Sequence, residues 1–143
     1  MRFKRIFVCP SVSRGTFTLC RRLVAVDGTF LKARFILTLL LAVGIDANGE
    51  LVPLAWAVVE SENGESWGWF LNHLRWALPE LVIEESTLVS NRDKGLREAE
   101  RALGGRVVVA HCCHHIKENF TEKFGRALQP LFWAAARAKT RAA

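Results

Sequence analysis

The stretch Leu23-Val24-Ala25-Val26-Asp27-Gly28-Thr29 determines the fold that this sequence predicts. Its first four residues form a short apolar run, and Asp27-Gly28-Thr29 is typical of a turn. The pattern therefore predicts a β-strand that closes on a turn, with a carboxylate at its tip. Asp27 is the first candidate functional residue.

Two further strands are predicted directly after this one. The run from 34 to 45 is almost continuously apolar and leads into Asp46-Ala47-Asn48-Gly49, where Asn-Gly favours the backbone of a tight hairpin. The return strand covers 51–59, with Pro53 near its beginning, as is typical of a strand start or an edge. Together the three strands predict an antiparallel meander.

The rest of the chain alternates helices and strands. Trp67, Phe70, Leu71 and Leu74 have helical spacing, which predicts a helix over 65–77 that Pro79 ends. The same reasoning predicts, in order, a strand over 87–90, a helix over 92–103, a strand over 106–110 and a helix over 114–128 that Pro130 breaks. The expected fold class is α/β, with a mixed five-stranded sheet of three antiparallel and two parallel strands flanked by helices.

Asp27 and Asn91 follow two strands that this order makes neighbours. If the strands pair, both side chains emerge at the same edge of the sheet, where an open α/β sheet normally places its functional site. Carboxylates on adjacent strands at such an edge would form a magnesium site for phosphate chemistry.

Composition limits the possible classes of protein. The chain has 143 residues, half of them apolar, which fits one globular domain and excludes disorder as the main state. The longest apolar run, 35–45, is far shorter than the roughly 20 residues of a membrane-spanning helix, so we expect no membrane partner. The cysteines, Cys9, Cys20, Cys112 and Cys113, do not form a secreted disulfide pattern, which favours a reducing intracellular compartment.

The net charge of +6 is unevenly distributed. Residues 1–26 and 126–143 contain basic side chains and no acidic ones. These ends suit a polyanion such as nucleic acid, and they are equally compatible with solvated termini. Trp69, His73 and Trp76 would form a second apolar stripe on the helix over 65–77, explained either by packing under another element of the chain or by a partner surface.

Four successive motifs resemble those of Mutator-like element (MULE) transposases. They are Ala25–Lys32, then Leu54–Asn63 with Ser66–Phe70, then Ser90–Leu96, and finally Cys112–His115 with Glu118–Phe120. The resemblance implies a ribonuclease-H-like core with strand order three, two, one, four, five. It also implies three acidic residues that hold two Mg²⁺ or Mn²⁺ ions for the cleavage and transfer of DNA strands. A nuclear location in a eukaryote and a homo-oligomer with intact transposase are further implications.

The resemblance assigns the metal site residue by residue. Asp27 matches the first acid, whereas Asn91 stands where the family usually has its second. Asp93 lies two residues further on and could act as a substitute, although a carboxylate in the first turn of a helix is also explained by the helix dipole. The third acid would lie in a later helix, and no acid follows Glu122 in this sequence; Glu118 and Glu122 are better explained as solvated helix positions.

These departures predict a catalytically inactive fragment of a DDE transposase core. A non-catalytic DNA-binding module derived from a transposase is the main alternative, and a marginally folded gene fragment is a third. Residues 1–20 are expected to be a basic lead-in, 21–128 the core, and 129–143 the truncated start of a helical region. The DNA-binding candidates are Arg21, Arg22, Lys32, Arg92 and Lys94.

The Cys112 to His115 segment matches the Cys-x-x-His motif of the family. Cys112 and His115 could share one Zn²⁺ ion, but four ligands drawn from the five consecutive residues 111–115 cannot surround one tetrahedral ion, so distant ligands would be needed. Structural packing at a helix start is the alternative explanation.

Overall fold

The computed structural model describes residues 3–32, 34–91, 94–104 and 106–139. The chain divides into two compact units, Met1–Ala110 and His111–Ala143, and each unit is described by itself. Among the described residues, no helix has the length and apolar character needed to cross a membrane.

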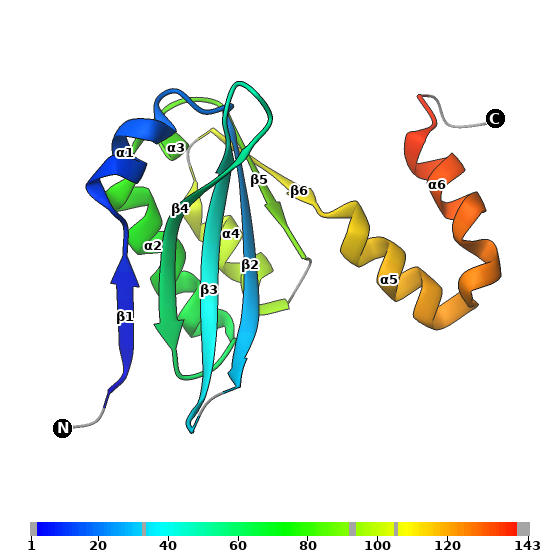
Figure 1. Cartoon of the computed structure of the whole chain (residues 1–143), viewed down its shortest axis with the longest axis horizontal. Helices are drawn as coiled ribbons and strands as arrows, with labels where there is room; N and C mark the ends of the chain where they lie inside the picture. The colour runs from blue at the N-terminus through cyan, green and yellow to red at the C-terminus, as the bar shows by residue number, and fades with distance from the viewer. Residues whose placement is uncertain (1–2, 33, 92–93, 105, 140–143) are drawn as a thin grey trace. The chain divides into compact units, whose positions relative to one another are not determined.

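The first unit is built on a six-stranded sheet (Figure 1). The strands are β1 (Arg5–Val8), β2 (Leu23–Lys32), β3 (Ile36–Ile45), β4 (Leu51–Val59), β5 (Ser86–Ser90) and β6 (Val107–His111). Their order is β1-β4-β3-β2-β5-β6. Apart from β1, this is the expected order three, two, one, four, five.

The expected count of five strands is wrong because β1 was missed. This strand and helix α1 (Ser11–Phe17) lie within the first 20 residues, which we expected to be a basic lead-in. β1 pairs antiparallel with β4, and Phe17 of α1 is fully buried. The start of the chain therefore extends the sheet at the β4 edge and contributes to the core.

The antiparallel meander β2-β3-β4 is confirmed by its register. At the β3–β4 turn, Asp46 Oδ1 accepts hydrogen bonds of 2.8 Å from the backbone N–H groups of both Asn48 and Glu50. Gly49 has φ of +89°, a conformation that glycine adopts without a steric cost. The Asn-Gly hairpin expected from the sequence is thus formed.

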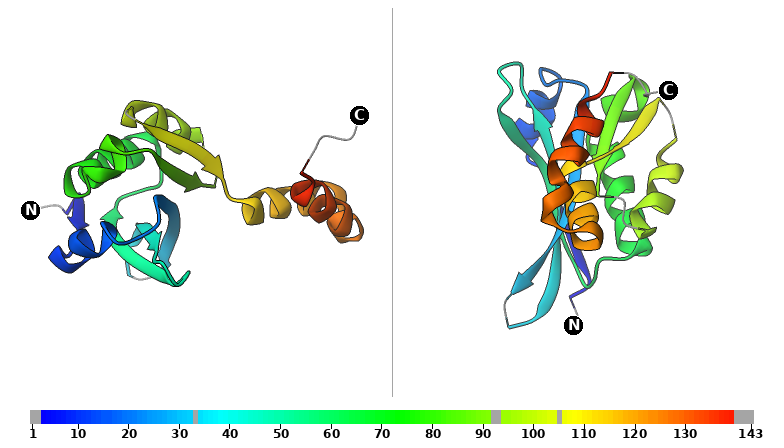
Figure 2. Two further views of the ribbon diagram at one scale, coloured as in Figure 1. Left: turned by 90° about the horizontal axis from the view of Figure 1, so that it is seen from above. Right: turned by 90° about the vertical axis from the view of Figure 1, so that its right-hand side faces the viewer.

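Helices α2 (Gly64–Ala77) and α4 (Lys94–Leu103) pack against each other, and Figure 2 shows them on one side of the sheet. The strands alternate between buried and more exposed residues, so one face of the sheet contributes its side chains to the core. A short helix, α3 (Glu80–Ile83), precedes β5. The largest fully buried side chains include Trp67, Phe17, Phe70, Leu40 and Leu54.

The second stripe on α2 is explained by packing for two of its three residues. The ring centroid of Phe7 on β1 lies 6.4 Å from that of Trp69 and 5.5 Å from that of His73. Trp76, in contrast, is 78% exposed. The missed strand β1 is therefore the element that packs against Trp69 and His73.

The second unit contains α5 (Cys113–Phe124), the 3₁₀ helix η1 (Arg126–Leu128) and α6 (Gln129–Arg137). The helix expected to continue to 128 ends at Phe124, since Gly125 follows with φ of +86°. Pro130 does not break a helix; it lies in the first turn of α6, where the missing N–H of proline has no cost. Phe120 of α5 and Phe132 of α6 join the two helices, with ring centroids 5.5 Å apart.

Candidate functional site at the β2–β5 edge

Asp27 lies within β2 rather than at its end. The strand continues to Lys32, and Asp27 pairs with Leu41 of β3. The expected turn at 27–29 is wrong because backbone pairing with β3 outweighs the local preference of Asp-Gly for a turn. Asp27 is exposed, whereas Val24 and Val26 are buried, and its Oδ1 accepts a hydrogen bond of 2.9 Å from the N–H of Gly28.

Asp27 and Asn91 lie at equal distances along the chain from the last pair between two parallel strands. β2 and β5 pair in parallel, with Ala25 opposite Val89 as the last pair. Asp27, within β2, and Asn91, directly after β5, each lie two residues beyond this pair. The expected neighbourhood of these two strands is confirmed, and Asn91 is half-buried directly after β5.

A second carboxylate reaches this segment from the loop before α2. If Gly28 had a β-carbon, this atom would lie 2.9 Å from Oε1 and 3.0 Å from Oε2 of Glu62. The carboxylate of Glu62 therefore lies against the backbone next to Asp27. Glu62 was expected only as part of a motif and was not assigned to the site.

The position of Glu62 is fixed by the beginning of α2. The indole N–H of Trp67, a fully buried residue, donates a hydrogen bond of 3.3 Å to Glu62 Oε1. The next residue, Asn63, is the N-cap, and its side chain accepts a hydrogen bond of 2.9 Å from the N–H of Ser66. The sequence signal that could have identified Glu62 is an acidic residue directly before an N-cap asparagine, with a tryptophan five residues after the acid.

The resemblance to MULE transposases implies divalent metal ions, and a carboxylate beside an amide is a donor set whose chemistry would suit one of them. Mg²⁺ prefers oxygen ligands and is commonly bound by one or two carboxylates together with substrate phosphates. Asp27 supplies a carboxylate and Asn91 supplies a neutral amide oxygen. No group of three or more histidine, cysteine, aspartate or glutamate residues is arranged to hold a metal ion in the part of the chain that is described.

The basic candidates for DNA contact have different environments. Arg22 forms an ion pair with Glu84 and its guanidinium lies over the ring of Phe17, so it is engaged within the fold. Arg21 and Lys32 are exposed, and Lys32 ends β2. Arg92 and Asp93 lie outside the described residues, and Lys94 begins α4.

The exposed apolar surface of the β2–β3 hairpin was not expected from the sequence. Three large apolar side chains near its tip are exposed: Phe30 by 68%, Phe35 by 68% and Ile36 by 86%. The exposed cations Lys32 and Arg34 lie between Phe30 and Phe35 in the sequence. Exposed apolar residues interleaved with cations are a feature of surfaces that bind nucleic acid.

Cys112 and His115 lie at the start of α5. Cys112 is the N-cap residue and is half-buried, and His115 is half-buried within the first turn. His114 and Glu118 lie one helical turn apart, with 3.0 Å between Nε2 and Oε1. All four cysteines are free. The zinc site remains a prediction.

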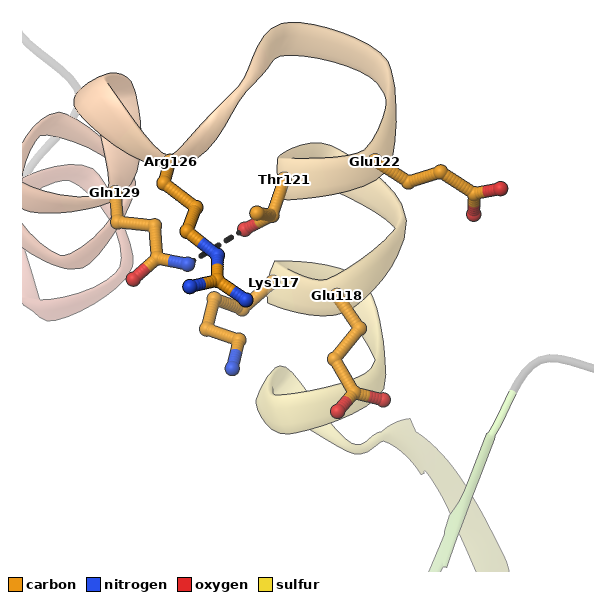
Figure 3. A pocket seen from close by; sticks show the side chains of 6 residues that line it. All are labelled: Lys117, Glu118, Thr121, Glu122, Arg126 and Gln129. Atoms are coloured by element: carbon orange, nitrogen blue, oxygen red, sulfur yellow. Dashed lines mark hydrogen bonds between the residues drawn. The ribbon is translucent and has the colours of Figure 1, made fainter.

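Glu118 and Glu122 line a surface pocket of about 550 Å³ in the second unit. Its other residues are Lys117, Thr121, Arg126 and Gln129. Gln129 Nε2 donates a hydrogen bond of 3.0 Å to Thr121 Oγ1. Figure 3 shows that the side chain of Glu122 points away from those of Lys117 and Arg126. The mixed charges of this pocket do not resemble a carboxylate site for metal ions.

The mixed six-stranded sheet flanked by helices places the first unit in the α/β class and is consistent with a ribonuclease-H-like core. The family model of the MULE transposase domain matches residues 23–119, which is more than half of the chain. The chain therefore belongs to the MULE transposase domain family, and a transposase domain implies interaction with DNA. No individual curated protein matches the chain.

Proposed function

We propose that this protein is a transposase-derived core that binds DNA and does not cleave it. In the family, the acids at this edge hold two ions, which activate the attacking hydroxyl and stabilise the leaving oxygen. The single observation that carries the proposal is the parallel pairing of β2 with β5, which ends two residues before Asp27 and two residues before Asn91, a neutral amide.

The physical reason is electrostatic. Two dications in one site repel each other strongly, and the anionic ligands between them offset this repulsion. A carboxamide offers one oxygen donor and no charge. Replacing the second carboxylate by Asn91 therefore lowers the affinity for a second ion and reduces charge neutralisation in the transition state.

DNA binding is supported by charge and by the hairpin surface. The net charge of +6 favours association with phosphates, and the exposed cations Lys32 and Arg34 lie in the sequence between the exposed aromatic residues Phe30 and Phe35. A gel-shift titration with duplex DNA at several salt concentrations tests this part. We expect binding that weakens steeply with salt, and binding that is undetectable at low salt would refute it.

Assembly with an intact transposase is part of the same proposal. An inactive core that retains its DNA contacts would compete for sites or enter mixed oligomers. Size-exclusion chromatography of the purified chain with and without duplex DNA tests whether it self-associates.

A further inference from the structure

We propose that the end of the β2–β3 hairpin binds unpaired DNA bases, on which the rings of Phe30 and Phe35 stack. The ligand is single-stranded DNA or a duplex that contains unpaired bases. This inference rests on the proposed function and deepens it, because it states which form of DNA the chain prefers and which side chains recognise it.

The first support is that the end of the hairpin is a two-stranded ribbon that extends beyond the neighbouring strands. Pairing of β2 with β5 ends at Ala25, and pairing of β3 with β4 ends at Thr38, which lies opposite Phe30. From there to Lys32 and Ile36, the two hairpin strands pair only with each other among the described residues. Figure 1 shows β2 and β3 extending past the ends of β4 and β5. A two-stranded ribbon is narrow enough to enter the major groove of DNA, so bases as well as phosphates can reach its side chains.

The second support is the set of side chains on one face of this ribbon. Phe30, Lys32 and Ile36 share a face, because Lys32 pairs with Ile36 and alternate residues of a strand point to the same side. Phe30 is the diagonal neighbour of Ile36, a spacing that aromatic side chains can bridge. Phe35, which is also exposed, directly precedes Ile36. The ribbon therefore presents aromatic and aliphatic surface next to a positive charge.

The third support is that this apolar surface is left in contact with water. Val26 and Leu40 lie on the same face of the two strands and are buried in the core, whereas Phe30 and Ile36 are exposed. Exposure of large apolar side chains is unfavourable, and a partner with apolar surface of its own would remove this cost.

The charge of the hairpin indicates that the partner is a polyanion. Residues 28–45 contain the exposed cations Lys32 and Arg34 and no acidic residue. Asp27, the nearest acid along β2, is an odd number of residues from Phe30 and so points to the opposite face. The carboxylate of Glu62 lies against Gly28, so the basic surface is confined to the end of the ribbon.

The combination of cations with aromatic rings favours unpaired bases over intact duplex. Cations alone are sufficient to contact phosphates, whereas an exposed ring gains most from a flat apolar partner, which in DNA is the face of a base. In an intact duplex these faces are covered by neighbouring base pairs. An anionic lipid surface would also attract cations and apolar side chains, but membership of the MULE transposase domain family favours DNA.

The test is fluorescence anisotropy with three labelled DNA ligands of equal length: a duplex, the same duplex with a central bubble of unpaired thymines, and a single strand. Wild type, Phe30→Ala, Phe35→Ala, Phe35→Leu and Trp76→Ala are titrated at one salt concentration. Trp76 lies on α2 and is 78% exposed, so it is the matched control for an exposed aromatic side chain outside the hairpin.

We expect wild type to bind the bubble and the single strand about tenfold more tightly than the intact duplex, because stacking on one base changes affinity by about this factor. Phe30→Ala and Phe35→Ala should each lose most of this preference, and Trp76→Ala should keep it. Phe35→Leu retains apolar bulk without an aromatic ring and should behave as Phe35→Ala does. Both rings are exposed, so these variants should fold, and an unchanged affinity for the intact duplex checks this.

Equal affinity of wild type for all three ligands would overturn the inference and leave the proposed function intact. A preference that Phe30→Ala and Phe35→Ala both keep, or that Trp76→Ala loses to the same extent, would also overturn it. Absence of binding to any of the three ligands would contradict the proposed function as well.

Sedimentation with vesicles that contain phosphatidylserine tests the alternative partner. We expect no binding that depends on Phe30 and Phe35. Vesicle binding that both alanine variants lose, in a chain without preference for the bubble, would assign the hairpin to a lipid surface instead.

Discussion

The carboxylate of Glu62 occupies the space into which a side chain on Gly28 would extend. This contact joins the strand that carries Asp27 to the beginning of α2. It explains why glycine follows the acid: any larger residue would displace a carboxylate that the indole of Trp67 holds in place.

Gly28→Ala should cost little stability. The atoms that a new β-carbon would meet belong to the end of a flexible side chain, so Glu62 can rotate away, and we expect a loss below about 1 kcal/mol. Urea denaturation measures it. Gly68→Ala in α2 is the control, because no atom lies within 4 Å of its β-carbon and alanine should stabilise the helix by about 0.5–1 kcal/mol. A loss of several kcal/mol in Gly28→Ala would mean that backbone, and not Glu62, limits this position.

The ion pair between Arg5 and Glu60 predicts a pH dependence of stability. Hydrogen bonding to Arg5 lowers the pKa of Glu60 from 4.5 to about 2. A lowered pKa in the folded state gives stability that is present above pH 4.5 and lost as the pH falls towards 2. Glu60 is 44% exposed, so solvent screening limits the contribution to about 1 kcal/mol or less.

The free energies of unfolding of wild type and Glu60→Gln, measured from pH 2 to pH 6, should therefore differ most above pH 4.5 and converge near pH 2. A difference that is constant across this range would show that the ion pair does not contribute through the charge of Glu60. This ion pair links Arg5 of β1 to Glu60, the residue that follows β4. Arg5 also forms an ion pair with Glu65, with 2.9 Å between Nη2 and Oε1.

The β2–β3 hairpin should contribute to DNA affinity. Lys32→Ala with Arg34→Ala is expected to reduce the slope of log K against log salt concentration by about 1 to 2, because each lost phosphate contact removes about 0.9. Gel-shift titrations measure the slope. Arg101→Ala, which removes an exposed cation from α4, is the control. An equal reduction of the slope in this variant would mean that overall charge, and not the hairpin, determines the affinity for DNA.

Zinc content should be well below one ion per chain. Cys112 and His115 provide two ligands, and the described residues contain no group of three or more suitable side chains. Elemental analysis of protein purified without a histidine tag measures this. One zinc per chain that disappears in Cys112→Ser would instead establish the Cys-x-x-His motif as a metal site.

Local patterns in the sequence predicted the meander and the crossover helices well. The strand over 51–59 and the helix ending at Ala77 occur where their periodicity indicated. β1 was missed because its four residues are followed by Pro10 and are surrounded by basic residues, and because its pairing with β4 is a long-range interaction. Hydrophobic periodicity does not encode which distant strand supplies a partner.

The site was predicted in part. The parallel pairing of β2, which contains Asp27, with β5, which precedes Asn91, followed from the order of the strands. The roles of the two residues stay predictions. The contact of Glu62 with Gly28 could not be derived, because it depends on how α2 is seated against the sheet. Asp-Gly was interpreted as a turn, and only pairing with Leu41 shows that Asp27 lies within a strand.

The most direct test of the central claim is a nicking assay on supercoiled DNA with Mg²⁺ or Mn²⁺. Our account predicts that the wild-type chain leaves the DNA supercoiled, since Asn91 supplies no charge beside Asp27. Nicking by the wild-type chain that is lost in Asp27→Asn would contradict it.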